Sequence, residues 1–312
     1  MPVYITRDNP EKERLIKKAL LLWRPSIDME KIIFLPGGSS SVAVRAGVFV
    51  CRFPQTAEAL AAIRIEAELT GILNKNLSEA SRRKMAEVSI AENSDENVLS
   101  FSYHRYIKGK IMDNIRGETE FNTCYARLNP KQKRRLALEI ALFFIDLHTL
   151  PITLFQRTSL SENRQDWDFT RKINKEKSRN LLLKHSDGKL DLNEFKTEVS
   201  DDIVFCHNDL SGSNLLIDLN DENILKGVID FGNSGLFPRT NEFIPLYKIG
   251  RELVVQTVGF YNQYSRKPVS MREIDYKFLC FVCFLLEQQK KPSFFTTALI
   301  KDFVQSYFNI RT

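Results

Sequence analysis

Two stretches of the chain alternate short apolar runs with turns. In residues 32–53, three apolar runs are separated by the turns Pro-Gly-Gly-Ser-Ser-Ser and Arg-Ala-Gly. In residues 203–229, three further runs are separated by a polar loop and by a turn rich in Asp and Asn. Short apolar runs bounded by such residues are typical of β-strands. We therefore expect three strands in each stretch.

Longer segments repeat apolar residues at helical spacing. Residues 56–73 begin with Thr56 as a predicted N-cap, and residues 130–148 follow an Asn-Pro pair that is typical of a helix start. Further helices are expected at residues 5–25, 244–265, 272–290 and 293–308. The charged region 157–200 has few apolar anchors and is expected to form an inserted helical pair that lines a substrate cleft.

Composition places the chain among soluble globular proteins, with 43% hydrophobic and 27% charged residues. It has no apolar run near the ~20 residues of a membrane span and no signal-peptide pattern at its start, so we expect a cytoplasmic monomer that does not bind a membrane. The five cysteines are an odd number in apolar surroundings. Cys280 and Cys283 lie in an apolar helical pattern without further ligands, which favours core packing over a zinc or redox site.

The net charge of +6 raises the alternative of a nucleic-acid-binding protein. Four of the basic residues, at 131 and 133–135, follow the predicted helix start at Pro130 and lie opposite that helix's apolar stripe. No aromatic residues are interleaved with them, as a platform for single strands would require. We therefore expect no nucleic-acid partner.

The loop after residue 206 carries residues with a recognisable spacing. His207 is followed by Asp209 and, five residues later, by Asn214, while the last strand of this stretch ends at Asp230-Phe231-Gly232. This is the arrangement of the catalytic and metal-binding loops of kinases. Asp209 is expected to accept the proton of an attacking hydroxyl, and Asn214 and Asp230 are expected to hold Mg²⁺ through oxygen ligands. The alternative, that these residues only form turns, does not explain both halves of the pattern at this spacing.

The small-residue loop in the first stretch suggests a flap over phosphates. Its members are Gly37, Gly38, Ser39, Ser40 and Ser41. Small residues let backbone N–H groups approach phosphate oxygens, although such a loop is also typical of a plain hairpin.

A cation is expected on the strand that follows this loop. Lysine is usual there, and Arg52 is the best candidate because its guanidinium binds phosphate through a fork of N–H groups. In the next helix, Glu66 is expected to pair with Arg52, with Glu68 as the second choice. The alternative is that Glu66 is a solvated acid on the helix surface.

The 312-residue chain is long for one core and fits two lobes. An apolar run at 98–107 predicts a strand that ends at Lys108-Gly109, so we expect lobes at residues 1–107 and 108–312. Backbone groups of the connecting segment are expected to hydrogen-bond the edge of a purine. His104, within this strand, is expected to be a packed residue rather than a ligand.

Four segments together resemble the aminoglycoside phosphotransferase family of the kinase-like superfamily, and within it the 2''-aminoglycoside phosphotransferases. They are Val50-Cys51-Arg52-Phe53-Pro54, Ile65-Glu66-Ala67, Phe205-Cys206-His207-Asn208-Asp209-Leu210-Ser211 and Gly227-Val228-Ile229-Asp230-Phe231-Gly232-Asn233-Ser234-Gly235. The resemblance spans roughly residues 30–290. It implies an α+β, two-lobed protein-kinase-like fold, with a small antiparallel-sheet lobe and a larger, mainly helical lobe. It also implies Mg²⁺ and ATP or GTP as phosphate donor.

The chain departs from the family's pattern after the Asp-Phe-Gly. Phe237-Pro238 stands where the family tends to have Asp-Pro, and Glu242 stands where it tends to have an Asp. Glu242 is expected to keep the role of an acid that braces the catalytic loop, and His207 is expected to support that loop. The changed Asp-Pro concerns the local backbone rather than the metal site.

The acceptor is expected to be a hydroxyl of an aminoglycoside-like small molecule. Ser211 stands where protein kinases carry a lysine, and no Ala-Pro-Glu follows, which argues against protein substrates. A polycationic acceptor requires a carboxylate-lined cleft, and residues 201–260 hold nine acidic and four basic residues. Glu242, Glu252 or acids of the 157–200 insert are candidates for that lining. The alternatives are a choline, ethanolamine or other metabolite kinase, and a kinase-fold binding module without activity.

Overall fold

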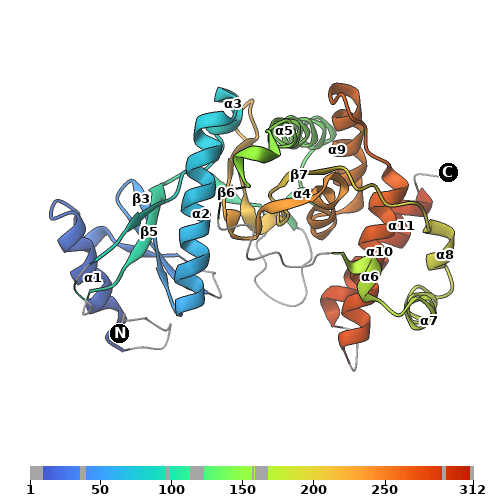
Figure 1. Ribbon diagram of the computed structural model, residues 1–312, viewed down its shortest axis with the longest axis horizontal. Helices are drawn as coiled ribbons and strands as arrows, with labels where there is room; N and C mark the ends of the chain where they lie inside the picture. The colour runs from blue at the N-terminus through green and yellow to red at the C-terminus, as the bar shows by residue number, and fades with distance from the viewer. Residues whose placement is uncertain are drawn as a thin grey trace.

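The computed structural model describes residues 10–35, 40–93, 95, 98–112, 123–156, 158, 168–289 and 293–309. It has two lobes side by side, a sheet-containing N-terminal lobe and a larger C-terminal lobe that carries most of the helices (Figure 1). All pairings between the named strands are antiparallel. The structure thus confirms the predicted α+β fold with a small antiparallel-sheet lobe and a mainly helical lobe.

The N-terminal lobe is built on a five-stranded sheet with the order β1-β2-β3-β5-β4. Its strands are β1 (Ile33–Phe34), β2 (Ser41–Ala46), β3 (Phe49–Pro54), β4 (Ser89–Ala91) and β5 (Phe101–Arg105). Helix α1 (Lys12–Trp23) buries Ile16 and Leu20 in one apolar cluster with Phe53 and Phe101 of the sheet. This cluster forms the core of the lobe and fixes the position of β3, the strand that carries Arg52.

Helix α2 (Ala57–Asn76) follows β3 in the first lobe and contacts the second lobe. The hydroxyl of Thr56 accepts the backbone N–H of Ala59 at 3.2 Å, so Thr56 is the N-cap as predicted. Glu66 lies in the middle of this helix and is buried. Its carboxylate accepts the backbone N–H of Phe231, in the C-terminal lobe, at 3.1 Å. The helix therefore brings an acid of one lobe to the Asp-Phe-Gly segment of the other.

The chain passes from one sheet to the other at residues 106–109. Strand β5 belongs to the first sheet, whereas β6 (Lys110–Ile111) pairs with β8 (Leu215–Ile217), which pairs with β9 (Leu225–Val228). Strand β7 (Ile203–Cys206) pairs with β10 (Gly235–Pro238). The sequence pattern did not indicate the short strands β6 and β10. The division into residues 1–107 and 108–312 stays a prediction.

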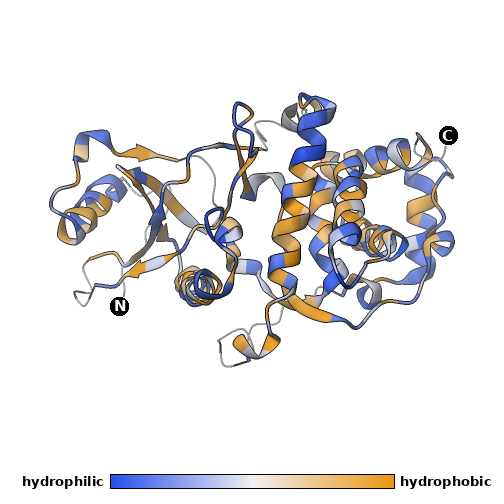
Figure 2. Ribbon diagram, turned by 90° about the horizontal axis from the view of Figure 1, so that it is seen from above, coloured by the Kyte–Doolittle hydropathy of each residue, from blue (hydrophilic) through white to orange (hydrophobic). Residues whose placement is uncertain are grey.

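Four longer helices form the core of the C-terminal lobe. They are α5 (Pro130–His148), α9 (Arg251–Tyr264), α10 (Met271–Gln288) and α11 (Phe294–Asn309). These helices contribute buried apolar side chains to one cluster, and Figure 2 shows apolar segments in orange on the helices of this lobe. Cys280 and Cys283 of α10 are fully buried in this core, as expected for packing residues.

Two predicted helical regions differ in detail. The helix expected at 244–265 is divided, because Arg239–Lys248 forms a 3-10 helix, η6, which contains Pro245. Gly250, with a φ of 151°, then precedes α9. Proline removes a backbone donor, and a positive φ favours glycine, so the residues at the break explain the division. The described part of the 157–200 insert holds three short helices rather than a pair: α6 (Phe169–Lys172), α7 (Lys175–His185) and α8 (Leu192–Phe195).

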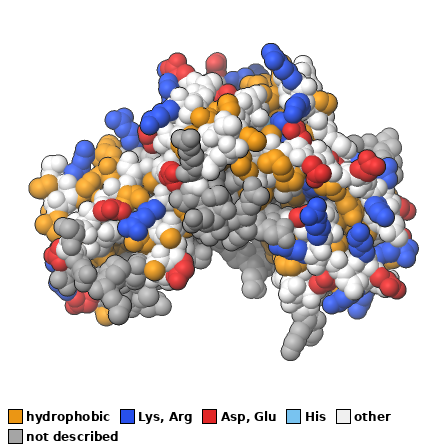
Figure 3. Space-filling view, in the orientation of Figure 1, with side chains coloured by type: hydrophobic (Ala, Val, Ile, Leu, Met, Phe, Trp, Pro, Cys, Tyr) orange, Lys and Arg blue, Asp and Glu red, His pale blue; other side chains and the backbone are white. Residues whose placement is uncertain are grey.

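Short elements complete the described chain. They are α3 (Glu79–Arg82), α4 (Thr123–Ala126), η1 (Met29–Lys31), η2 (Ile152–Leu154), η4 (Gly212–Asn214) and η5 (Phe231–Asn233). Among the described residues, no helix combines the length and the apolar character needed to span a membrane. Basic and acidic side chains are interspersed on the face shown in Figure 3.

Candidate active site

The loop after β7 is tied to the end of β9 through His207. Its Nε2 donates to the backbone carbonyl of Ile229 at 3.1 Å, and its Nδ1 accepts the backbone N–H of Asp209 at 3.3 Å. These partners define a neutral imidazole with its proton on Nε2. His207 therefore holds the backbone of Asp209 at a fixed place relative to the strand that ends at Asp230.

Asn214 joins the same two loops. Its side-chain Nδ2 donates to the carbonyl of Asp209 at 2.8 Å, and its own carbonyl accepts the N–H of Ile229 at 3.1 Å. Because the amide nitrogen is used, the amide oxygen is left as a ligand. Asp230 has a left-handed backbone with φ 66°, and its side chain is 50% exposed. A positive φ at a residue other than glycine is uncommon and is often found at functional sites.

Arg52 and Glu66 form a buried ion pair, as the sequence predicted for Glu66 rather than Glu68. Nη1 of Arg52 also lies 3.8 Å from the carboxylate of Asp230, and its buried Nε has no hydrogen-bond partner. Burial disfavours the charge of Arg52, but Glu66 and Asp230 outweigh this effect and raise its pKa. The guanidinium thus stays charged and retains an N–H group that an anion would satisfy.

These residues border one cavity of about 560 Å³ between the lobes. The N-terminal lobe contributes apolar residues such as Ala43 and Val50, and the C-terminal lobe contributes Leu216 and Ile229. Other lining residues are Arg52, Glu66, Asn214, Asp230 and, in the connecting segment, Tyr106, Ile107 and Gly109. The cavity thus combines apolar walls with the charged groups of Arg52, Glu66 and Asp230 and with the connecting segment, as is usual for a small-molecule site.

The other predicted residues of this cleft have mixed outcomes. Ser40 and Ser41 line the cavity, whereas Gly37, Gly38 and Ser39 lie outside the described residues. His104 is 9% exposed, and its Nδ1 is 2.9 Å from the carbonyl of Arg105, so it is packed as expected. Its burial lowers the pKa to about 4. His104 also lines the cavity, a position that the sequence did not indicate.

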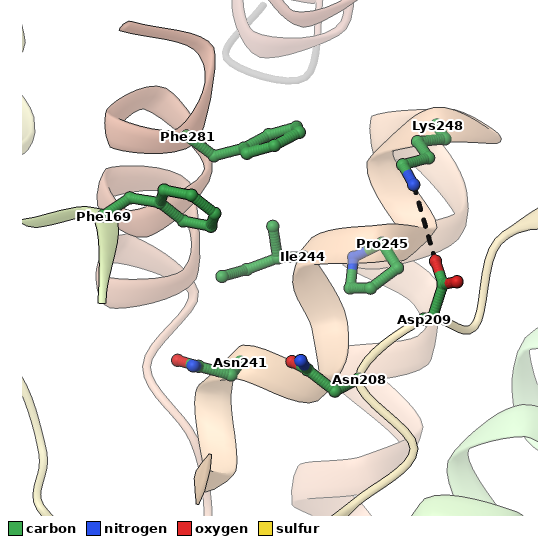
Figure 4. Close-up of a pocket in the computed structure, with 8 residues that line it drawn as sticks. All are labelled: Phe169, Asn208, Asp209, Asn241, Ile244, Pro245, Lys248 and Phe281. Atoms are coloured by element: carbon green, nitrogen blue, oxygen red, sulfur yellow. Dashed lines mark ion pairs between the residues drawn. The ribbon is translucent and has the colours of Figure 1, made fainter. Parts of the chain in front are cut away.

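The side chain of Asp209 has two partners of its own, and it lines a small pocket distinct from the cavity that Asn214 and Asp230 line. Asn233 donates to one carboxylate oxygen at 3.1 Å, and the ammonium of Lys248 lies 3.5 Å from the other. Figure 4 shows the Lys248 contact at one side of a small pocket that both residues line. The sequence reasoning missed both residues. Asn233 directly follows the Asp-Phe-Gly, but no contact with Asp209 was predicted for it. Lys248 is far along the chain from Asp209, and nothing in the sequence pattern indicated that the two side chains meet.

Glu242 braces the loop from behind. It is fully buried, and its two carboxylate oxygens accept the backbone N–H groups of His207 at 2.7 Å and of Asn208 at 3.3 Å. His148 lies 3.6 Å from the same carboxylate and hydrogen-bonds the hydroxyl of Tyr261 at 2.9 Å. Burial lowers the pKa of His148, which favours the neutral ring. The expected bracing contact of Glu242 is therefore present.

Among the described residues, one cluster of potential metal ligands occurs outside the cleft. His148, Cys206 and Glu242 have ligand atoms within 4.8 Å of one another. However, both oxygens of Glu242 already accept backbone N–H groups, and burial raises the pKa of the Cys206 thiol well above its ordinary value. Metal ligands must be deprotonated, so this cluster is better explained as a structural network than as a metal centre.

The pair Asn214 and Asp230 fits a magnesium site better. Both residues line the cleft, and both offer the hard oxygen donors that Mg²⁺ prefers. The half-exposed Asp230 carboxylate faces Arg52 at 3.8 Å and leaves room for further ligands such as phosphate oxygens and water.

Several solved structures have the same fold. The GDP and kanamycin complex of APH(2")-IIIa has a TM-score of 0.64 at 19% identity and covers 95% of this chain and 99% of its own. The streptomycin–ATP complex of APH(2")-IIa has a TM-score of 0.57 at 19% identity and covers 95% and 97%. Macrolide 2'-phosphotransferase MphH from Brachybacterium faecium has a TM-score of 0.60 at 12% identity and covers 92% and 98%.

The sequence comparisons give the family directly. No curated protein matches the chain. A family model, described as the phosphotransferase enzyme family, matches residues 31–274, which is more than half of the chain. The matched range 31–274 includes the ion pair of Arg52 and Glu66 and the loops that carry Asp209 and Asp230. The chain therefore belongs to the phosphotransferase enzyme family.

Proposed function

We propose that this protein is a Mg²⁺-dependent kinase that transfers the γ-phosphoryl group of ATP or GTP to a hydroxyl of a small molecule. The observation that supports this most is the way two loops and one ion pair come together. Asn214 and Asp230 of the C-terminal lobe line one cleft with the Arg52–Glu66 pair of the N-terminal lobe. Asp209 is joined to Asn214 through its backbone carbonyl, and its side chain lines the small pocket. Positioning and charge stabilisation are the main requirements of phosphoryl transfer.

Each residue then has one role in the reaction. Asp209 accepts the proton of the acceptor hydroxyl as its oxygen bonds to the γ-phosphorus, and the bond from that phosphorus to the β–γ bridging oxygen breaks. The nucleoside diphosphate leaves with the electrons of that bond. Arg52 binds the phosphates of the nucleotide, and Glu66 orients Arg52. Asn214 and Asp230 would hold Mg²⁺, which neutralises the charge of the phosphates when bound.

The acceptor predicted from the sequence is aminoglycoside-like. Support comes from similar structures that are complexes with kanamycin, streptomycin and gentamicin. The similarity at 18–19% identity concerns the fold, and one fold hosts many substrates. The residues that line the pocket beside Asp209 are therefore the better guide to the class of acceptor.

A coupled assay of nucleoside diphosphate release tests the function. The purified chain is incubated with Mg²⁺ and with ATP or GTP, across aminoglycosides, macrolides, amino alcohols and hydroxy acids. Asp209→Asn should lower stimulated turnover by about 10³-fold or more, while Mg²⁺-nucleotide binding in a titration stays near that of the wild type. Asp230→Ala should lose the Mg²⁺-dependent part of nucleotide binding. Wild-type turnover in Asp209→Asn would refute the role of Asp209 as the base.

A further inference from the structure

The pocket beside Asp209 is where an acceptor hydroxyl has to enter. It is lined by Phe169, Asn208, Asp209, Asn241, Ile244, Pro245, Lys248 and Phe281 (Figure 4). Its free space is about 30 Å³, room for roughly two waters, since one needs about 10–15 Å³. The pocket thus takes the hydroxyl-bearing end of a molecule rather than a whole sugar ring.

Three side chains around this space offer hydrogen-bond donors beside the carboxylate of Asp209. Asn208 is 4% exposed, and its Nδ2 is buried without any hydrogen-bond partner. The ammonium of Lys248 is the second donor, and its side chain is one-third exposed. The amide oxygen of Asn241 accepts from Lys277 at 3.0 Å, which leaves its NH₂ group as a third donor. A ligand that satisfies these groups must bring oxygen acceptors.

Two of the acids expected to line a cleft for polycations, Glu242 and Glu252, lie elsewhere in the described part of the chain. Glu242 is fully buried, with both oxygens on the backbone of the catalytic loop. Glu252 forms an ion pair with Lys133 at 2.7 Å and does not line the pocket. Among the lining residues in the described part of the chain, Asp209 is the single carboxylate, and Lys248 already faces it at 3.5 Å.

The remaining wall is apolar and partly aromatic. Phe169 of α6 and Phe281 of α10 pack with their ring centroids 5.1 Å apart, and Ile244 and Pro245 of η6 lie across from them (Figure 4). Such a wall contacts an apolar group at the reacting end of the acceptor and offers an ammonium group only the faces of two rings. The pocket therefore combines apolar contact with donor groups next to the base.

We propose that the acceptor is a hydroxyl compound whose reacting end has no positive charge, with a carboxylate or carbonyl oxygen beside the reacting hydroxyl and an apolar group next to them. This assignment rests on the proposed kinase function. The carboxylate or carbonyl oxygen accepts from Lys248 and from the unpartnered Nδ2 of Asn208, while the hydroxyl faces Asp209. An ammonium in the same place meets a like charge and N–H groups that it cannot bond.

Matched pairs of compounds test this assignment. 3-Phenyllactate is compared with phenylalaninol, and gluconate with glucosamine, with kanamycin as the polycation. Binding to the full chain with Mg²⁺ and ADP is measured by titration, and turnover with ATP and GTP by the coupled assay. In each pair, the anionic compound is expected to bind or react at least tenfold better than its cationic partner. In Lys248→Glu this ratio should fall at least tenfold, because the donor and the positive charge are both lost.

Lys267→Gln is the matched control, since Lys267 also pairs with an aspartate, Asp202 at 3.1 Å, but does not line the pocket. Its ratio should equal that of the wild type. The assignment is overturned if no non-cationic compound exceeds its cationic partner, or if Lys248→Glu leaves the ratio unchanged. Failure of the kinase function itself is recognised separately, as nucleotide binding that depends neither on Mg²⁺ nor on Asp230.

Discussion

The carboxylate of Glu242 accepts the backbone N–H of His207 at 2.7 Å, in a site from which solvent is excluded. The second oxygen takes the N–H of Asn208, whose backbone has a left-handed φ of 61°. Two neighbouring donors on one acid fix the direction in which the loop leaves β7. The catalytic candidate Asp209 comes directly after them, so its place is set by a residue that does not itself face the cleft.

Replacing Glu242 by Gln should lower both stability and turnover. The Gln side chain keeps one oxygen acceptor but sets an NH₂ group against the other backbone N–H, and a buried unsatisfied donor costs about 1–3 kcal/mol. We expect the free energy of unfolding in urea to fall by about that amount and kcat to fall about tenfold. Glu242→Asp, which retains both acceptors, should lose less of each. Equal losses in the two variants would contradict this account.

Asn233 is expected to position Asp209. Its side chain donates to the Asp209 carboxylate at 3.1 Å, and hydrogen bonds to charged groups contribute about 1.5–3 kcal/mol. Asn233→Ala should therefore reduce kcat about 10–100-fold, with the Kd of the Mg²⁺-nucleotide nearly unchanged, because Asn233 does not line the nucleotide cleft. Asn233→Asp places a second carboxylate beside Asp209 and should be worse than alanine. A variant that weakens nucleotide binding instead would assign Asn233 to the other side of the site.

Two substitutions of Arg52 distinguish the contribution of its positive charge from that of its forked N–H geometry. Arg52→Lys keeps a cation beside Glu66 but loses the fork of N–H groups, whereas Arg52→Ala leaves the buried Glu66 without its partner. We expect the Kd for ATP or GTP to rise about tenfold in the lysine variant. The alanine variant should also lose about 3–5 kcal/mol of stability, the usual result of breaking a buried ion pair. If both variants unfold at the same urea concentration as the wild type, the ion pair has no structural role.

The sequence pattern indicated the main strands, the helix starts at Thr56 and Pro130, and the Arg52–Glu66 pair. These features depend on local spacing, on capping and on residues that are close along the chain or stand in a fixed order. It did not indicate β6 or β10, which are two and four residues long. Such short strands are defined by the partner that they meet in space rather than by their own composition.

The acceptor side of the site was the least predictable part. The count of acids in residues 201–260 suggested a pocket for polycations, but that count contains no information on direction. Glu242 points to the backbone of the loop, and Glu252 points to Lys133. Lys248 reaches Asp209 only because η6 and the loop after β7 pack together. The spacing of residues along the chain gives no information on the direction in which a side chain points across a tertiary contact.

His104 should make the free energy of unfolding decrease at acidic pH. Burial holds its pKa at about 4, against about 6.5 in the unfolded chain. Below pH 6.5 the unfolded state binds a proton that the folded state does not, so this histidine makes the protein lose stability as the pH falls from about 6.5 to 4, by about 3 kcal/mol in total. His148, whose pKa is also lowered by burial, acts in the same direction. The free energy of unfolding in urea, measured from pH 7.5 to 4.5, should therefore fall less steeply in His104→Gln than in the wild type, and parallel curves would show that His104 is protonated in the folded state.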